Sequence, residues 1–262
     1  MGCFFIFNTS TFSILTYLYF MRLVIVLEFF VLISYNLLAQ DNDPARLVLE
    51  TDTLTVNDQL YREDQFYASI TYNLLGNKPE GVSQSGFSTG YHIGFIRDMP
   101  FNKRRNWAIG LGFGLSSNSF NNTLLITETN SEYTYRVIDE DDQQYDKNKF
   151  TNYMLEFPFE LRWRTSTVSE YNFWRVYAGF KLGYIVYNSS KFISNSGDVR
   201  LSQIDDMNRL QYGLTFSAGY SNISFHIYYA LNSIFNDDAQ ISEGVAQVKM
   251  NAIKIGLMFY IL

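Results

Sequence analysis

Residues 210–220, LQYGLTFSAGY, decide the fold, because their side chains alternate between two chemically different faces. Apolar residues occupy the even positions from Leu210 to Tyr220, and small or polar residues such as Gly213 and Ser217 occupy the odd positions. A period of two is typical of a β-strand that has a different environment on each side. In a membrane barrel the apolar face points outward to lipid and the polar face points inward, the reverse of a soluble barrel.

The same alternation recurs along the chain and predicts eight strands. Their apolar faces are expected over residues 66–74, 87–95, 107–115, 153–163, 174–186, 210–220, 223–231 and 253–261. No position on these faces is charged. A lipid-facing Arg or Lys would cost about 2–4 kcal/mol at the middle of the bilayer, which explains the absence.

The connections between the predicted strands alternate in length. The long ones cover residues 75–86, 117–149, 187–206 and 233–247, and the short ones cover 98–106, 165–172 and 221–222. Outer-membrane barrels have long outer loops and short periplasmic turns. The sequence therefore predicts an all-β fold, an eight-stranded antiparallel up-and-down transmembrane barrel in the bacterial outer membrane. A soluble lipocalin-like barrel is the rival fold.

Composition supports one domain without a prosthetic group. A single barrel over residues 66–262 fits a chain of 262 residues. The net charge of -6 provides no basic field to attract nucleic acid. The one cysteine, Cys3, precedes the barrel, and His92 and His226 are the only histidines. We therefore expect no metal and no cofactor.

The N-terminal region is predicted to be a targeting segment. From Met21 an apolar run leads to a small residue, Ala39, so residues 1–39 are interpreted as a signal peptide. Residues 1–20 precede this second methionine and can be interpreted as an over-extended gene start. The alternative to a cleaved signal peptide is a retained membrane anchor. Residues 40–65 are polar and acidic, and predict either a periplasmic lead-in or a short plug.

The three tryptophans test the predicted topology independently. Trp107 begins the third strand, Trp163 ends the fourth and Trp174 begins the fifth. This topology places all three at the periplasmic rim, where an interfacial aromatic girdle is expected.

The inward face combines many glycines with a few long charged side chains. The charged residues are Glu156, Glu160, Arg162, Arg175, Lys181 and Lys254. Pairing of Trp163 with Trp174 would place Glu156 beside Lys181, Arg162 beside Arg175, and Glu160 diagonal to Arg175. Because buried charges need partners and eight strands leave room only for side chains, we expect a packed structural lumen; a proton or ion pathway is the alternative.

Other motifs have weaker functional interpretations. The inward Pro158 cannot donate to the ladder and predicts a β-bulge in the fourth strand. Inward Ser224 with His226, or His92, would serve a hydrolase, although packing is the simpler interpretation. The acidic run 139–142 is interpreted as a solvated loop or a cation or lipopolysaccharide contact, and the basic turn 103–105 as a solvated turn or a docking site for an acidic partner.

Two stretches, residues 66–115 and 152–184, carry a family resemblance. The segment LEFPFELRWRT (155–165), the basic turn and the glycine-rich third strand resemble the PorT-like outer-membrane barrels of gliding, type IX-secreting bacteria. The resemblance implies a small barrel and a role beside the type IX secretion apparatus; it implies no functional residues.

The predicted function is a structural or accessory role in the envelope, without enzymatic activity. The expected partners are outer-membrane lipids and lipopolysaccharide, together with secretion-apparatus proteins where the resemblance extends to function. A narrow channel and an OmpX-like surface adhesion barrel are the alternatives.

Overall fold

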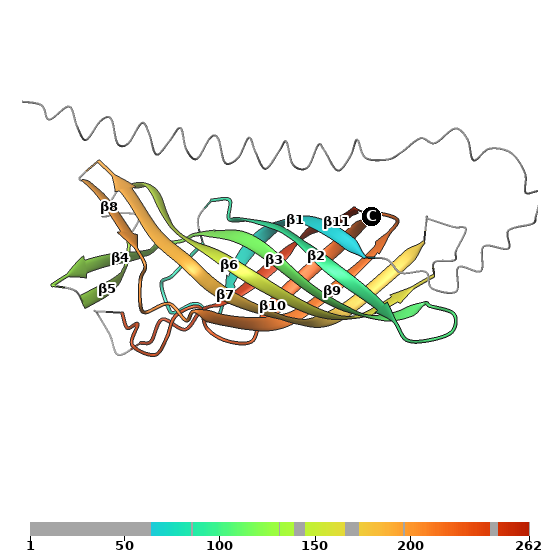
Figure 1. The fold of residues 1–262 in the computed structure, drawn as a ribbon. Coiled ribbons are helices and arrows are strands. Elements are labelled where there is room, and N and C mark those ends of the chain that lie inside the picture. Colours follow the sequence, from blue (N-terminus) through green and yellow to red (C-terminus); the bar gives the residue numbers. More distant parts are fainter. Residues whose placement is uncertain are drawn as a thin grey trace, which may run out of the picture. The chain divides into compact units, whose positions relative to one another are not determined.

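The computed structural model describes residues 64–84, 86–130, 132–138, 145–165, 173–195, 197–241 and 246–261. These residues form eleven strands, shown in Figure 1. The strands are β1 (Gln65–Gly76), β2 (Thr89–Pro100), β3 (Trp107–Asn121), β4 (Leu124–Thr129), β5 (Glu132–Val137), β6 (Tyr145–Arg164), β7 (Trp174–Ser194), β8 (Gly197–Ser202), β9 (Leu210–Tyr220), β10 (Ile223–Ala230) and β11 (Asn251–Ile261). The predicted signal peptide, residues 40–63 of the lead-in and the acidic run 139–142 lie outside the described residues.

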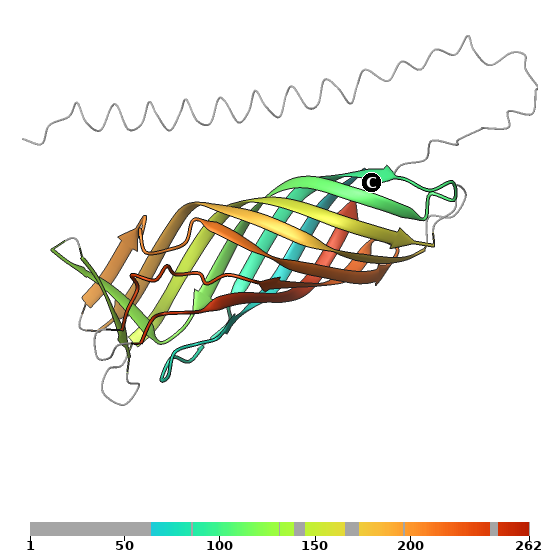
Figure 2. The same ribbon diagram turned by 90° about the horizontal axis from the view of Figure 1, so that it is seen from below.

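Eight of the strands close into a barrel. Each pairs antiparallel with the next in the order β1, β2, β3, β6, β7, β9, β10 and β11, and β11 pairs with β1 to complete the ring. Figures 1 and 2 show these strands tilted around the barrel, with β4, β5 and β8 beyond one end. The predicted eight-stranded up-and-down barrel is confirmed.

The outward and inward faces are those that the alternation predicts. Phe66, Ile93 and Leu214 are 61%, 59% and 52% exposed, whereas the intervening Tyr67 and Thr215 are buried. The tight hairpin predicted at residues 221–222 is also present, since Tyr220 pairs with Ile223 and Ser221 has a φ of 54°. An apolar outer surface around a polar interior is the arrangement of a membrane barrel.

No helix in the described part of the chain is long and apolar enough to cross a membrane.

The strands at the outer end are longer than the hydrophobic pattern predicts. β6 begins at Tyr145 rather than near residue 153, and β7 continues to Ser194 rather than ending near residue 186. The outward residues of these extensions include polar ones such as Thr151, Lys149 and Lys191. Because hydrophobic alternation detects only strands that face lipid, it misses strand segments that stand in water.

The register of β6 against β7 differs from the predicted one by two residues. Trp163 pairs with Val176 instead of Trp174, and Arg164 pairs with Arg175. The expected bulge at Pro158 is absent. Proline has no N–H to donate, and the pairing of β6 with β3 is interrupted next to Pro158, but the register is the same on both sides of the interruption. Register shifts between β6 and β7 lie instead between Tyr153 and Met154, opposite an extra residue in β7, and between Tyr145 and Lys147.

Candidate functional site

The lumen contains one ion network near the end with the short turns. The Asp98 carboxylate accepts hydrogen bonds from Arg162 Nη1 at 3.3 Å and from Arg164 Nη1 at 2.8 Å. Arg162 Nε donates to Glu160 at 3.0 Å, and Arg164 Nε donates to the carbonyl of Arg105 at 3.1 Å. Asp98 and both arginines are 0% exposed. Charges so deeply buried are tolerable only when partners satisfy them, and this network ties β2, β6 and the 101–106 turn together.

A second network lies nearer the middle of the barrel around Glu156. Its carboxylate binds Lys181 Nζ at 3.1 Å and His92 Nδ1 at 3.1 Å, and Lys254 Nζ lies at 3.9 Å. His92 Nε2 lies 3.2 Å from Thr71 Oγ1. One carboxylate on β6 therefore connects β2, β7 and β11 across the lumen.

The described lumen has more positive than negative charge. Five buried cations face three buried carboxylates; they are Arg162, Arg164, Arg175, Lys181 and Lys254, against Asp98, Glu156 and Glu160. Aromatic rings also stabilise some of these cations. Arg162 Cζ lies 4.5 Å from the ring centre of Tyr177, and Lys254 Nζ lies 4.9 Å from that of Tyr228.

Among the described residues, Arg175 has no carboxylate partner. Its guanidinium carbon lies 4.6 Å from the ring centre of Phe173 and 5.0 Å from that of Tyr260. None of its three nitrogens has a hydrogen-bond acceptor in the described part of the chain. Aromatic rings therefore contact this cation, whereas the predicted register would have placed Glu160 diagonal to it.

The structure brings some of the predicted lumen residues together and separates others. Glu156, Lys181 and Lys254 meet, as do Glu160 and Arg162, but Arg175 joins neither group. Sequence reasoning missed Asp98 and Arg164. The prediction places Asp98 at the start of the connection 98–106 and ends the fourth strand at Trp163, just before Arg164. Each residue lies two positions beyond a predicted inward residue, and this spacing is the signal that could have found them.

The glycines form a wall against which Tyr67 packs. A Cβ added to Gly94 would lie 2.6 Å from the Tyr67 ring and 2.6 Å from the carbonyl oxygen of Phe113. A Cβ at Gly114 would collide with the Tyr67 hydroxyl. Glycine is therefore needed here for close approach.

We expect Gly114→Val to destabilise the barrel by about 1–3 kcal/mol, the usual cost of overpacking a filled interior. Urea unfolding in lipid vesicles would measure the change. Leu115→Phe adds volume to the lipid-facing side of the same strand and is the control, with little change expected. Equal stability of Gly114→Val and the wild type would show that the wall has spare room.

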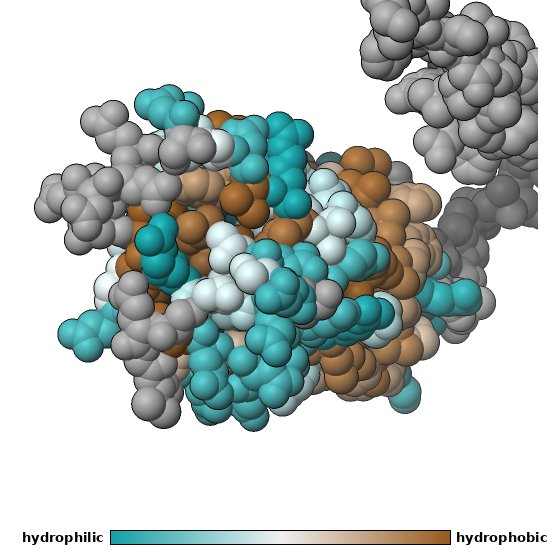
Figure 3. Space-filling model, turned by 90° about the vertical axis from the view of Figure 1, so that its left-hand side faces the viewer, coloured by the Kyte–Doolittle hydropathy of each residue, from teal (hydrophilic) through white to brown (hydrophobic). Residues whose placement is uncertain are grey.

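A folded cap covers the outer end of the barrel. Loop residues such as Ile126, Tyr135 and Phe235 pack on barrel residues that face inward, among them Phe120 and Phe150, in one buried apolar core. The rings of Phe150 and Phe235 are in edge contact, with centres 5.6 Å apart. Figure 3 faces this end and shows polar side chains over much of the coloured surface, with apolar ones between them. The cap closes the lumen with an apolar core.

Polar contacts hold the cap in place. The Asn148 amide donates to the carbonyls of Asn122 and Leu124, both at 2.8 Å. The Tyr135 hydroxyl donates to Asp206 at 2.9 Å. Burial of the ring, reinforced by the nearby Asp206 carboxylate, raises the pKa of Tyr135, so the hydroxyl stays protonated and able to donate.

Both histidines are buried in the wall of the lumen. Ser217 Oγ lies 2.7 Å from His226 Nδ1, whereas the predicted partner Ser224 has no hydrogen-bond partner in the described residues. His92 is bound to Glu156. All these side chains are buried in the wall of the lumen. No cluster of three or more His, Cys, Asp or Glu side chains that could hold a metal occurs within the described ranges.

Aromatic residues mark both edges of the apolar band. Trp107 pairs with Trp163, and Trp174 lies at the same end beside Tyr220, with ring centres 5.3 Å apart. At the other edge Tyr153 contacts Tyr187, with ring centres 5.8 Å apart. Trp163 is ten residue steps along β6 from Tyr153. At about 3.3 Å per residue and a tilt of about 40°, these steps span about 25 Å, the height of an outer-membrane barrel's apolar band.

The closed barrel, its lipid-compatible outer face and its two aromatic edges define a transmembrane barrel of the outer-membrane type. The family model described as outer membrane protein beta-barrel domain matches residues 38–236. The chain belongs to this family, and its location is the bacterial outer membrane. A comparison with curated proteins finds no match.

Solved structures of similar arrangement include the attachment invasion locus protein Ail of Yersinia pestis and a porin of Rh. blastica. Ail in complex with the heparin analogue sucrose octasulfate is 16% identical, with a TM-score of 0.34 and coverage of 76% of this chain and 99% of that chain. A porin mutant is 8% identical, with a TM-score of 0.19 and coverage of 77% and 100%. Likenesses this low say nothing about the ligands of this chain.

Proposed function

We propose that this protein is a non-conducting, non-enzymatic barrel with a structural or accessory role in the outer membrane. The observation that carries the proposal is the filled interior. Ion networks around Asp98 and Glu156 occupy the lumen, and an apolar core closes its outer end. The Ser217–His226 pair is buried in the same wall, which supports a packing role for it.

The conductance of the purified barrel tests this proposal against the narrow channel. In planar bilayers the wild-type protein is expected to give no discrete ion-passing steps, because an eight-stranded lumen is filled by side chains. A porin added to the same bilayer is the positive control. Reproducible steps from the wild-type protein would contradict the proposal and favour a channel.

A more specific accessory role, support of type IX secretion, is proposed from the resemblance to PorT-like barrels. Deletion of the gene in a type IX-secreting host is expected to reduce the amount of secreted cargo. Complementation with the full chain is the control for polar effects. Normal secretion after deletion would remove the secretion role and leave the accessory barrel unaffected.

Surface adhesion is the second candidate, and the folded cap favours it. Its hairpin β4–β5 stands beyond the barrel strands (Figure 1) and presents Glu128 and Glu132, both exposed. Replacement of residues 124–137 by a short Gly-Ser linker would remove this hairpin. Binding to host surfaces or partner cells that survives the replacement would argue against the hairpin as the adhesive element.

A further inference from the structure

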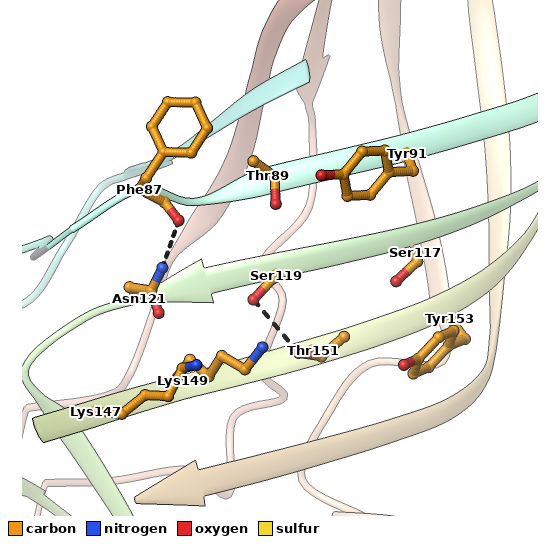
Figure 4. Close-up of a pocket in the computed structure, with 10 residues that line it drawn as sticks. All are labelled: Phe87, Thr89, Tyr91, Ser117, Ser119, Asn121, Lys147, Lys149, Thr151 and Tyr153. Atoms are coloured by element: carbon orange, nitrogen blue, oxygen red, sulfur yellow. Dashed lines mark hydrogen bonds between the residues drawn. The ribbon is translucent and has the colours of Figure 1, made fainter. Parts of the chain in front are cut away.

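A groove lies on the outside of the barrel, just above the tyrosine edge of the apolar band. It has a volume of about 250 Å³ and is formed by side chains of β2, β3 and β6. Figure 4 shows its lining, which comprises Phe87, Thr89, Tyr91, Ser117, Ser119, Asn121, Lys147, Lys149, Thr151 and Tyr153. Hydroxyl groups line its middle, tyrosines its membrane side and lysines its outer side.

Hydrogen bonds within the groove hold its polar rim in shape. The Asn121 amide donates to the Phe87 carbonyl at 2.7 Å, and Thr151 Oγ1 donates to Ser119 Oγ at 3.5 Å (Figure 4). The Ser88 hydroxyl accepts from the backbone N–H of Asn121 at 2.9 Å. The lining is therefore held by three paired strands and by side-chain bonds between them.

Lysines cluster at this groove without a salt-bridge partner among the described residues. Lys149 on β6 pairs directly with Lys191 on β7, and Lys191 pairs with Arg200 on β8. Like charges directly opposite one another destabilise a sheet. Within the described part of the chain, no carboxylate forms a salt bridge with Lys147, Lys149 or Lys191, although Asp198 binds Arg200 at 3.3 Å.

The lysines also affect one another electrostatically. Partial burial lowers the pKa of Lys149, and the neighbouring charges of Lys147 and Lys191 lower it further. An anion bound between them would relieve this repulsion, because an opposite charge within about 4–6 Å favours the protonated amine.

The position of the groove along the barrel, relative to the membrane, indicates which kind of anion it would bind. Below it the outward residues of β3 are Leu111, Phe113 and Leu115, which face acyl chains; within it they become Ser117 and Ser119. The groove therefore lies at the headgroup level of the outer leaflet. Phosphate suits lysine ammonium groups, sugar hydroxyls suit the serine and threonine hydroxyls, and tyrosine rings suit the boundary between wet and apolar regions.

We propose that this groove binds the phosphorylated sugar headgroup of an outer-leaflet glycolipid of the lipid A type. Its phosphate lies among Lys147, Lys149 and Lys191, its sugar hydroxyls face Ser117, Ser119 and Thr151, and its acyl chains descend past the tyrosine edge. The proposal concerns a site on the outer wall, and it holds whether or not the barrel has the accessory role proposed above.

The test compares binding of one glycolipid to two charge-matched variants of the full chain. The test variant is Lys149→Gln with Lys191→Gln. The control is Lys103→Gln with Arg104→Gln, which removes two exposed charges from the turn at the opposite end. Each protein is folded in phosphatidylcholine nanodiscs, and binding of diphosphorylated lipid A is titrated by native mass spectrometry; heat-modifiable gel mobility verifies that each variant is folded.

We expect the test variant to bind diphosphorylated lipid A at least about tenfold more weakly than the wild type, since charge-assisted hydrogen bonds to phosphate are the strong ones. The control variant should bind as the wild type does, and dephosphorylated lipid A should bind weakly to all three proteins. Equal binding by the test variant and the wild type, or equal weakening in both variants, would overturn the site. Undiminished binding of the dephosphorylated lipid would overturn phosphate recognition.

Discussion

Asp98→Ala is expected to lower the free energy of unfolding of the barrel by about 3–5 kcal/mol, the usual cost of removing one partner from a buried ion pair. Asp98 is the carboxylate that accepts from both Arg162 and Arg164, and all three residues are 0% exposed. Without it, two guanidinium groups lose an acceptor in a place that water does not reach freely.

The measurement is urea unfolding of protein refolded into lipid vesicles, followed by tryptophan fluorescence and by heat-modifiable gel mobility. The matched control is Asp205→Ala. Asp205 binds Arg209 at 3.5 Å, and the two side chains are 79% and 59% exposed, so the expected loss is below about 1 kcal/mol. Equal losses for the two variants would show that the Asp98 network contributes no more than a surface pair does.

A second variant separates charge from packing at the same place. Asp98→Leu combined with Arg164→Met replaces the shorter ion pair by apolar side chains. Such replacements of buried pairs are often neutral or stabilising, so the double variant should recover much of the stability that Asp98→Ala loses. A double variant as unstable as the single one would indicate that loss of packing, not the unpaired charge, causes the effect.

The second large effect is expected from Glu156→Gln, which should also cost about 3–5 kcal/mol. Among the described residues, Glu156 is the only carboxylate that forms salt bridges with Lys181 or Lys254, and it also binds His92. The amide keeps the shape of the side chain but removes its charge, so two lysines in the lumen lose their counter-charge.

The measurement is the same unfolding titration, with Asp198→Gln as the control because Asp198 and Arg200 form an exposed pair. Adding Lys181→Gln to Glu156→Gln removes one of the unpaired lysines and should return part of the lost stability. Additive losses in this double variant would contradict a direct interaction between Glu156 and Lys181, since contacting residues are expected to be non-additive.

The sequence predicts the barrel well because each element of the prediction rests on a strong physical constraint. A strand that crosses lipid must alternate, as Leu210 to Tyr220 does, and its aromatic residues gather at the ends of the apolar stretch, as Trp107, Trp163 and Trp174 do at one end. Both constraints act on each residue separately, so they can be recognised without knowledge of the partner strand.

The charge networks and the register are harder to predict because they depend on pairs of strands. Alignment of Trp163 with Trp174 is a reasonable interfacial match, yet the pairing is shifted by two residues, which moves Arg175 away from Glu160. The cap is harder still to predict: Phe150 and Phe235 are in contact although they are 85 positions apart in the sequence, and no periodic pattern connects them. Contacts that depend on how loops fold back leave no local signal in the sequence.

The part of β6 that extends beyond the membrane determines how far the cap stands from the lipid surface. From Tyr153 the strand continues for eight residues to Tyr145, which at about 3.3 Å per residue and a tilt of about 40° raises the cap about 20 Å above the lipid boundary. At that height the cap stands clear of the apolar band and of the lipid headgroups, so a partner that binds the cap can reach it without entering the membrane.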